Sequence, residues 1–176
     1  MTSPRGEQIK STGVSRVRVS QTISIPATTN YTAEDVISDN ASTGTYGTFS
    51  NVVASPGGSG TIVQAVCVVQ TTNQAHRVTL LLFNAVPTSN LNDNAVNTAP
   101  AWADLAGYIG EINYPALNDR GGASKAEVIP GEGKLPKPFT CAVGSKDIYY
   151  IAITEDAFTN EAADDDYNFA ILVDQN

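Results

Sequence analysis

The chain has 176 residues, enough for one domain that buries about 70% of its unfolded surface without a metal or a disulfide. Only 16% of its residues are charged, against about 25% in an average globular protein. Thr, Ser, Asn, Gly and Val fill the difference, which favours strands and turns. No run approaches the ~18 apolar residues of a membrane-spanning helix, so we expect a soluble protein without a membrane partner.

The net charge of −8 is unevenly distributed along the chain. Residues 1–18 hold four of the ten basic residues and one of the 18 acidic residues, which leaves −11 on the remainder. Such an acidic body repels the phosphate backbone, so we expect no direct contact with nucleic acid. The four basic residues at the start form a candidate contact segment. They are Arg5, Lys10, Arg16 and Arg18.

Residues 1–16 are polar and show no periodicity, so we interpret them as an extended N-terminal arm. The folded domain is then expected to span residues 17–176. It begins with an alternation of apolar and polar residues from Val17 to Ile25, which predicts a strand that ends before Pro26.

A pair of long apolar strands is expected after residues 31–60, of which residues 40–60 are rich in Gly, Ser and Thr. That earlier segment is predicted to form loops, one short strand and one helical turn at most. Alternation in the first long strand places Val63 and Cys67 on a core face. Because the polar residues 71–74 separate two apolar runs, we predict a hairpin over residues 61–86 with both faces partly buried.

The second half of the chain predicts one short helix and five strands. The helix is expected at Pro100–Ala106, before Gly107. The strands are predicted at Tyr108–Ile112, Lys125–Ile129, Phe139–Val143, Ile148–Thr154 and Asn168–Val173. This pattern indicates an all-β fold, an antiparallel β-sandwich or jelly roll with one short helix. The core is expected to contain Val63, Cys67, Val78, Leu80, Leu82, Ile151, Ile153 and Ile171.

The residues that could act as nucleophile and base are few. His76 is the sole histidine, and Cys67 would face it across the predicted hairpin. An apolar core face keeps a thiol protonated and inert, however. We therefore expect Cys67 and Cys141 to be free and buried, with a disulfide between paired strands as the alternative. One histidine and two distant cysteines do not make a zinc site.

Other motifs for ligands are weak. The runs Asn92–Asn94 and Asp164–Asp166 offer oxygen ligands without the spacing of a calcium loop, so we interpret them as solvated turns. The segment Ser55–Gly60 lacks the lysine and the helix of a phosphate-binding loop. No local pattern selects a carboxylate pair for glycoside hydrolysis. We predict that the protein is not an enzyme and holds no metal or other cofactor.

Six segments, by their order and spacing, resemble a family of tailed-bacteriophage virion proteins described as head decoration or structural proteins. They are Gly60–Val66, Leu80–Asn84 with Pro87, Asn92–Ala95, Leu135–Phe139, Asp147–Ala152 and Phe169–Gln175. Together they span about residues 31–176. The resemblance implies a β-sandwich on the outer capsid surface, with the major capsid protein as partner and a homo-oligomer, a trimer being favoured. The basic residues 1–18 and the acidic residues 161–166 depart from the family's pattern.

These expectations describe a capsid decoration (cement) protein, assembled in the host cytoplasm, that adds buried interface between capsomers. Its four basic residues would contact a capsid neighbour or a sister subunit, the alternative being a tail without a partner. A receptor- or glycan-binding domain of a phage fibre or spike is the main rival. Trp102 with Tyr149 or Tyr150 could stack on a sugar, although alternation puts the two tyrosines on opposite faces. A hydrolase would need two facing carboxylates within about 10 Å.

Overall fold

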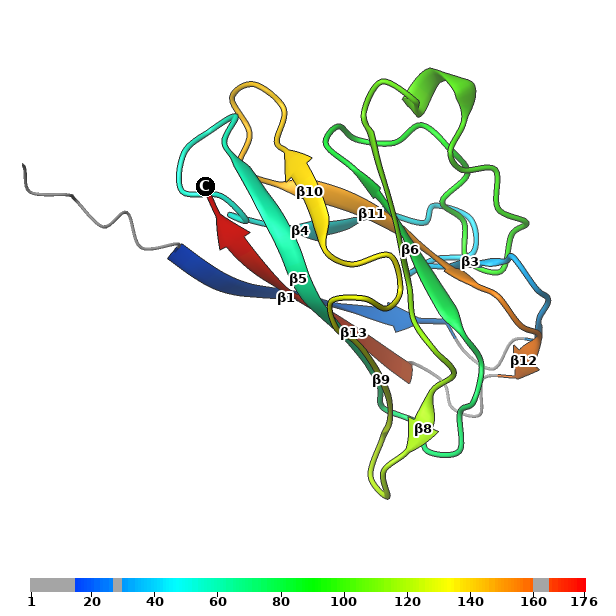
Figure 1. Ribbon diagram of the computed structural model, residues 1–176. Coiled ribbons are helices and arrows are strands. Elements are labelled where there is room, and N and C mark those ends of the chain that lie inside the picture. The colour runs from blue at the N-terminus through cyan, green and yellow to red at the C-terminus, as the bar shows by residue number, and fades with distance from the viewer. Residues whose placement is uncertain (1–14, 27–29, 160–164) are drawn as a thin grey trace, which may run out of the picture.

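The computed structural model describes residues 15–26, 30–159 and 165–176, which form two antiparallel sheets packed face to face (Figure 1). This arrangement confirms the predicted all-β sandwich. The helical structure of the described residues is a single 3-10 turn, η1 (Trp102–Asp104), where the sequence predicts a helix over Pro100–Ala106. No helix in this part of the chain is long and apolar enough to span a membrane.

The first sheet places the first and last strands side by side. Its order is β1, β13, β5, β9 and β8, and β10 pairs with the part of β5 that β9 does not reach. The bounds are β1 Ser15–Ile25, β13 Asp165–Gln175, β5 Ser59–Val69, β9 Ser124–Val128, β8 Asn118–Asp119 and β10 Lys137–Thr140. Since β1 begins at Ser15, two residues of the predicted arm belong to the sheet.

The second sheet has the order β3, β11, β6 and β7, and β4 pairs with the part of β11 that β3 does not reach. The bounds are β3 Val36–Ile37, β11 Ile148–Thr154, β6 Val78–Phe83, β7 Tyr108–Asn113 and β4 Gly47–Phe49. A separate two-stranded ladder joins β2 (Asn30–Tyr31) to β12 (Phe158–Thr159). The predicted strand at Ile148–Thr154 is confirmed residue for residue.

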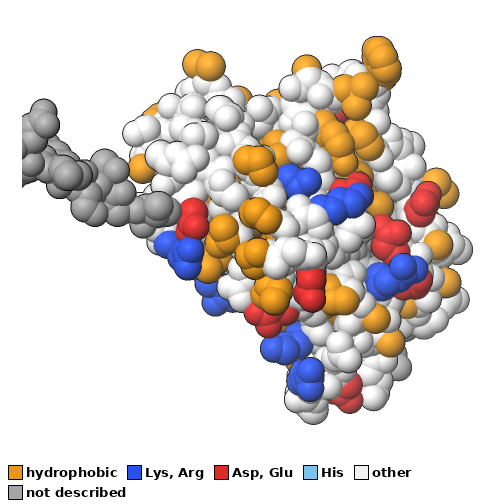
Figure 2. All heavy atoms as spheres, viewed as in Figure 1, with side chains coloured by type: hydrophobic (Ala, Val, Ile, Leu, Met, Phe, Trp, Pro, Cys, Tyr) orange, Lys and Arg blue, Asp and Glu red, His pale blue; other side chains and the backbone are white. Residues whose placement is uncertain are grey.

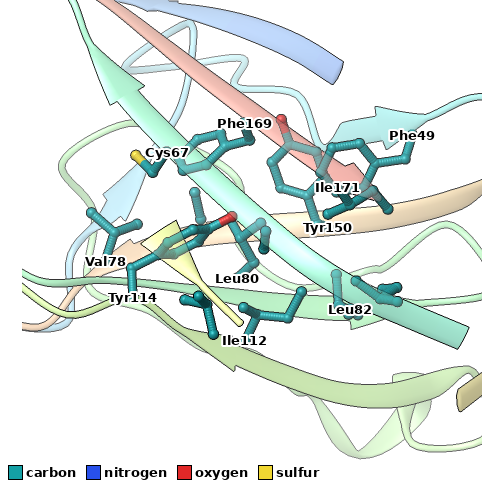
Figure 3. Packing of buried hydrophobic residues seen from close by; sticks show 14 of the residues in the cluster. Phe49, Cys67, Val78, Leu80, Leu82, Ile112, Tyr114, Tyr150, Phe169 and Ile171 are labelled. Atoms are coloured by element: carbon teal, nitrogen blue, oxygen red, sulfur yellow. The ribbon is translucent and has the colours of Figure 1, made fainter. Parts of the chain in front are cut away.

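The main core lies between the two sheets and is built from their inward-facing side chains (Figure 3). The first sheet contributes Cys67 from β5 and Phe169 from β13, and the second contributes Leu80 from β6 and Tyr150 from β11. Of the eight side chains that we expect in the core, seven are buried. They are Cys67, Val78, Leu80, Leu82, Ile151, Ile153 and Ile171.

The second sheet is buried on both of its faces. On the face away from the main core, Leu81, Phe83 and Ile151 belong to a second apolar cluster, against which Leu91 and Ala99 of a long loop pack. All six residues of β6 are consequently buried. This double coverage explains why β6 is a continuous apolar run rather than an alternating one.

The predicted hairpin over residues 61–86 is wrong. β5 belongs to the first sheet and β6 to the second, so residues 70–77 lead from one layer of the sandwich to the other. This connection has eight residues, whereas hairpin loops usually have about two to five. Two apolar runs joined by a polar segment look alike in sequence whether the strands pair or lie in opposite sheets.

Val63 is the one expected core residue that is not buried, whereas Ile151 and Ile153 are buried in the second cluster. Leu172 of β13 pairs with Gln64, and the next residue, Val173, pairs with Ile62, so Val63 is the extra residue of a β-bulge. A bulge changes the face on which the following side chains lie. Ile62 is therefore fully buried, while Val63 is only half-buried.

The bulge predicts unequal costs for two neighbouring truncations. Ile62→Ala should lower the free energy of unfolding by about 3 kcal/mol, because it leaves a cavity in the main core. Val63→Ala should cost less than about 1 kcal/mol, since its side chain is partly in solvent. Urea denaturation of the two variants measures both values, and an equal or larger loss for Val63→Ala would place the bulge elsewhere.

Candidate binding surfaces

The face of the first sheet that points away from the core is open in the described structure, and we call it the outer face. Strand register brings side chains from three strands together on it: Leu172 of β13 lies beside Gln64 of β5, and Ala170 beside Val66. Val68 follows on β5, opposite Lys125 of β9. In the middle of the outer face is an apolar stripe, formed by Val66, Val68, Ala170 and Leu172.

The stripe has charged groups of both signs around it. Figure 2 shows hydrophobic side chains gathered over β5 and β13, with basic and acidic side chains beside them. Glu127 lies opposite Val66 and accepts a hydrogen bond of 2.5 Å from Gln64. Asp166 accepts a hydrogen bond from the hydroxyl of Ser24.

Two of the four expected contact residues lie on this sheet, and both are in β1 rather than in an arm. Arg16 donates two hydrogen bonds to Asp174, at 2.5 and 3.0 Å, and this pairing lowers the pKa of the Asp174 carboxyl. Arg18 lies opposite Leu172 and is exposed, and no described carboxylate pairs with it. Arg5 and Lys10 lie outside the described residues.

The three aromatic residues that could stack on a sugar, Trp102, Tyr149 and Tyr150, do not form a shared platform. Tyr150 is buried against Phe49, with ring centroids 4.6 Å apart. Tyr149 on the other face is half-buried and meets Tyr46 edge-on. Trp102, on η1, is 89% exposed.

Trp102 belongs to a small apolar tip, which we define as Trp102, Leu105 and Val86. All three side chains are exposed. Beside them, Val86 and Ala103 line a hollow of about 170 Å³. The carboxylate of Asp104 also lines this hollow, but its oxygens already accept hydrogen bonds from Thr88 and Ser89. The tip therefore offers a flat ring and an apolar recess rather than a charged site.

His76 lies in a buried aromatic stack. Its ring is 3.7 Å from that of Phe158, which in turn stacks on Tyr31 at 4.5 Å. Its Nε2 is 3.0 Å from the hydroxyl of Tyr167. Burial lowers the pKa of His76 to about 4, so the ring is neutral near pH 7. An open hollow of about 420 Å³ adjoins the stack, and Asn73, Gln74, Asp156 and Thr159 supply its polar lining.

The candidate chemical pair of Cys67 and His76 is not formed, since His76 bonds to Tyr167 instead. Cys67 and Cys141 are both free and buried, as expected from the sequence. Burial raises the pKa of the Cys67 thiol well above its ordinary value and that of Cys141 to about 11. Both thiols are therefore protonated near pH 7 and are poor nucleophiles.

Two carboxylates that the sequence predicts in solvated turns, Asp93 and Asp165, are buried, while Asp164 lies outside the described residues. Asp93 is buried, and it accepts hydrogen bonds from the hydroxyl of Tyr31 at 2.7 Å and from the amide of Ser38 at 2.8 Å. Asp165 is also buried and accepts a bond from the amide of Thr71. These carboxylates hold backbone segments in place. Within the described ranges, no group of three His, Cys, Asp or Glu side chains could hold a metal ion.

No protein-family model matches the chain, and no curated protein matches it in sequence. The outer face and the apolar tip are the two candidate surfaces that the geometry of the described residues offers. The outer face is the more extended of the two, because it runs along three strands, whereas the tip consists of a few loop residues.

The buried neutral ring of His76 predicts a pH dependence of stability. Its pKa of about 4 is below the ordinary 6.5, so the unfolded chain binds the proton more tightly. The contribution of His76 to the free energy of unfolding is therefore fully present above pH 6.5 and is lost as the pH falls toward 4. Between pH 7 and pH 5 the free energy of unfolding should fall by about 2 kcal/mol.

The variant His76→Gln keeps a polar partner for Tyr167 but cannot titrate. It should be less stable than the unmodified protein at pH 7, yet it should lack this decline between pH 7 and pH 5. Urea denaturation of both proteins at pH 7 and pH 5 measures the decline. Because the two proteins have the same carboxylates, the contribution of these groups cancels in the comparison. Equal slopes would show that His76 titrates near its ordinary value.

Proposed function

We propose that the protein is a non-enzymatic capsid decoration protein of a tailed bacteriophage. In this role it binds the outer surface of the major capsid protein lattice and stabilises the DNA-filled head. The resemblance of its segments to head decoration proteins suggests this role. The structural observation that supports it is the apolar stripe on the outer face of the first sheet.

The stripe is unusual for a sheet face in contact with water. In an antiparallel sheet with one open face, outward residues are normally polar. Residues Ala65–Val69 of β5 are apolar at every position, a pattern typical of a strand covered on both faces. The main core covers one face, whereas the outward Val66, Val68 and Leu172 belong to neither described apolar cluster and are only half-buried. A partner surface would complete the burial of this strand.

A capsid lattice is a suitable partner because the gain is repeated at every copy. Complete burial of a Val or Leu side chain contributes about 1.5–3 kcal/mol. Val66, Val68 and Leu172 are already half-buried and Ala170 is only 2% exposed, so each would contribute less. The charged groups beside the stripe, including Lys125 and Glu127, would set orientation more than affinity. Many modest contacts of this kind add up over a shell.

Val68→Glu tests whether the stripe is the docking surface. The new carboxylate would lie opposite Lys125, so the fold should tolerate it. A carboxylate in place of an apolar side chain would have to lose its hydration in the interface, which should weaken binding to capsid shells at least tenfold, or about 1.4 kcal/mol. Co-sedimentation with shells that lack the protein measures the affinity.

Val143→Glu is the matched control, because Val143 is 101% exposed on the loop between β10 and β11. Its binding should equal that of the unmodified protein. Circular dichroism and thermal unfolding verify that both variants are folded. If a folded Val68→Glu variant binds as well as the control, the stripe is not the docking surface.

Glycan binding by a fibre or spike domain is a second candidate, supported by the exposure of Trp102. A Trp face in water can stack on a sugar ring. Trp102 is the sole Trp of the chain, so its fluorescence should change on addition of a bound glycan, and Trp102→Ala should abolish binding on a glycan array. Glycan binding that survives in Trp102→Ala would remove the tip from consideration.

A further inference from the structure

β1 is a long strand at the edge of the first sheet. It has 11 residues, and among the described strands it pairs only with β13. Its register with β13 is continuous, without a bulge, and Pro26 follows the strand rather than interrupting it. Proteins usually protect such an edge with a bulge, an internal proline, a short strand or charged side chains. Of these, β1 has only the charges of Arg16 and Arg18, both near its start.

The direction of the free backbone groups follows from a bond on the other side of β13. The amide of Gln70 donates to the carbonyl of Asp166 at 2.9 Å, so Asp166 directs its backbone groups toward β5. Backbone directions alternate along a strand. Asp166 pairs with Ser24, so Ser24 and every second residue of β1 direct their N–H and C=O groups away from β13. These residues are Arg16, Arg18, Ser20, Thr22 and Ser24.

The charges near the two ends of this edge have opposite signs, so two antiparallel copies of the edge complement each other. Arg18 is exposed near the start of β1, and no described carboxylate pairs with it. Asp166, beside Ser24 near the end of β1, accepts the Ser24 hydroxyl, and no described cation pairs with it. Antiparallel pairing of two such edges brings the start of one beside the end of the other.

We propose that β1 pairs with β1 of a second copy of this chain about a twofold axis, so that the two first sheets become one continuous sheet. Arg18 would lie opposite Ser24 of the second copy, and Ser20 opposite Thr22. In this register the N–H and C=O groups that point away from β13 form hydrogen bonds with the same groups of the second copy across the twofold axis. Asp166 of the second copy lies on β13, next to that Ser24 and one strand beyond it. The long side chain of Arg18 can therefore reach the Asp166 carboxylate.

One of the two adjacent registers is less favourable because of an existing ion pair. A shift of two residues would place Arg16 opposite Ser24 of the second copy, but Arg16 is already bound to Asp174. The proposed register also covers Val17 and Val19, which pack against the core but are only partly buried. A twofold contact of this kind is isologous and closes with two copies. It therefore differs from the trimer that the family resemblance implies.

The test is the mass of the full chain in solution, measured by light scattering and sedimentation over a concentration series. Twice the monomer mass is expected, and a monomer or a trimer at all concentrations would overturn the proposal. Ser20→Pro removes an N–H that faces the free edge, not β13, so the first sheet should stay intact while the dimer dissociates. Ser20→Ala, which keeps this N–H, should remain dimeric.

A charge exchange tests the register independently of the proline. Arg18→Asp should weaken dimerisation at least tenfold, and Arg18→Asp combined with Asp166→Arg should restore it. A dimer that resists both Ser20→Pro and Arg18→Asp forms through another surface, which would overturn the proposal. The capsid-binding role is assessed by Val68→Glu on shells, so failure of either proposal is distinguishable from failure of the other.

Discussion

The pairing of β13 between β1 and β5 is the constraint on which the rest of the sandwich depends. The last strand of the chain inserts beside the first, with 11 consecutive residue pairs along β1, and its other edge pairs with β5. This ladder sets which side chains face inward: Phe169 and Ile171 enter the main core beside Cys67. The same ladder places Ala170 and Leu172 on the outer face, so core and candidate surface are two consequences of one register.

A second set of contacts ties the loops at one end of the sandwich. Tyr31 of β2 and Phe158 of β12 stack, and His76 lies on the other side of Phe158. Tyr31 and His76 bond through their polar atoms to Asp93 and Tyr167, respectively. These bonds offset part of the desolvation of the buried polar atoms that make them, while Nδ1 of His76 is buried without a hydrogen-bond partner among the described residues. His76 is thus accounted for as a structural residue, although a lone histidine in a sequence first suggests chemistry.

Sequence periodicity predicted the strands well because alternation reports directly on which face is buried. It located β11 without error and seven of the eight expected core residues. It could not show that β5 and β6 lie in different sheets, since strand partners are chosen by long-range packing. It also missed the bulge at Val63, because the extra residue is itself apolar and leaves the pattern unbroken.

Polar residues were harder to predict, because their role depends on partners that are distant in sequence. Asp93 and Asp165 lie in acidic runs typical of solvated turns, yet each is buried and accepts a backbone amide from a remote segment. Arg16 belongs to a basic cluster by composition, but Asp174, 158 residues away, binds it. Both arginines on β1 are exposed, but only Arg18 has no described carboxylate partner.

The outer face and the free edge of β1 belong to the same sheet, and this has a consequence for binding. If two copies join through β1, their apolar stripes lie on one continuous surface, related by the twofold axis. Two stripes held together bind a repetitive lattice with an effective concentration set by a rigid sheet rather than by a flexible linker. A modest contact at each stripe would then suffice, which is consistent with the half-buried side chains of Val66, Val68 and Leu172. The edge pairing would thus convert one sandwich with a small apolar stripe into a bivalent binding surface.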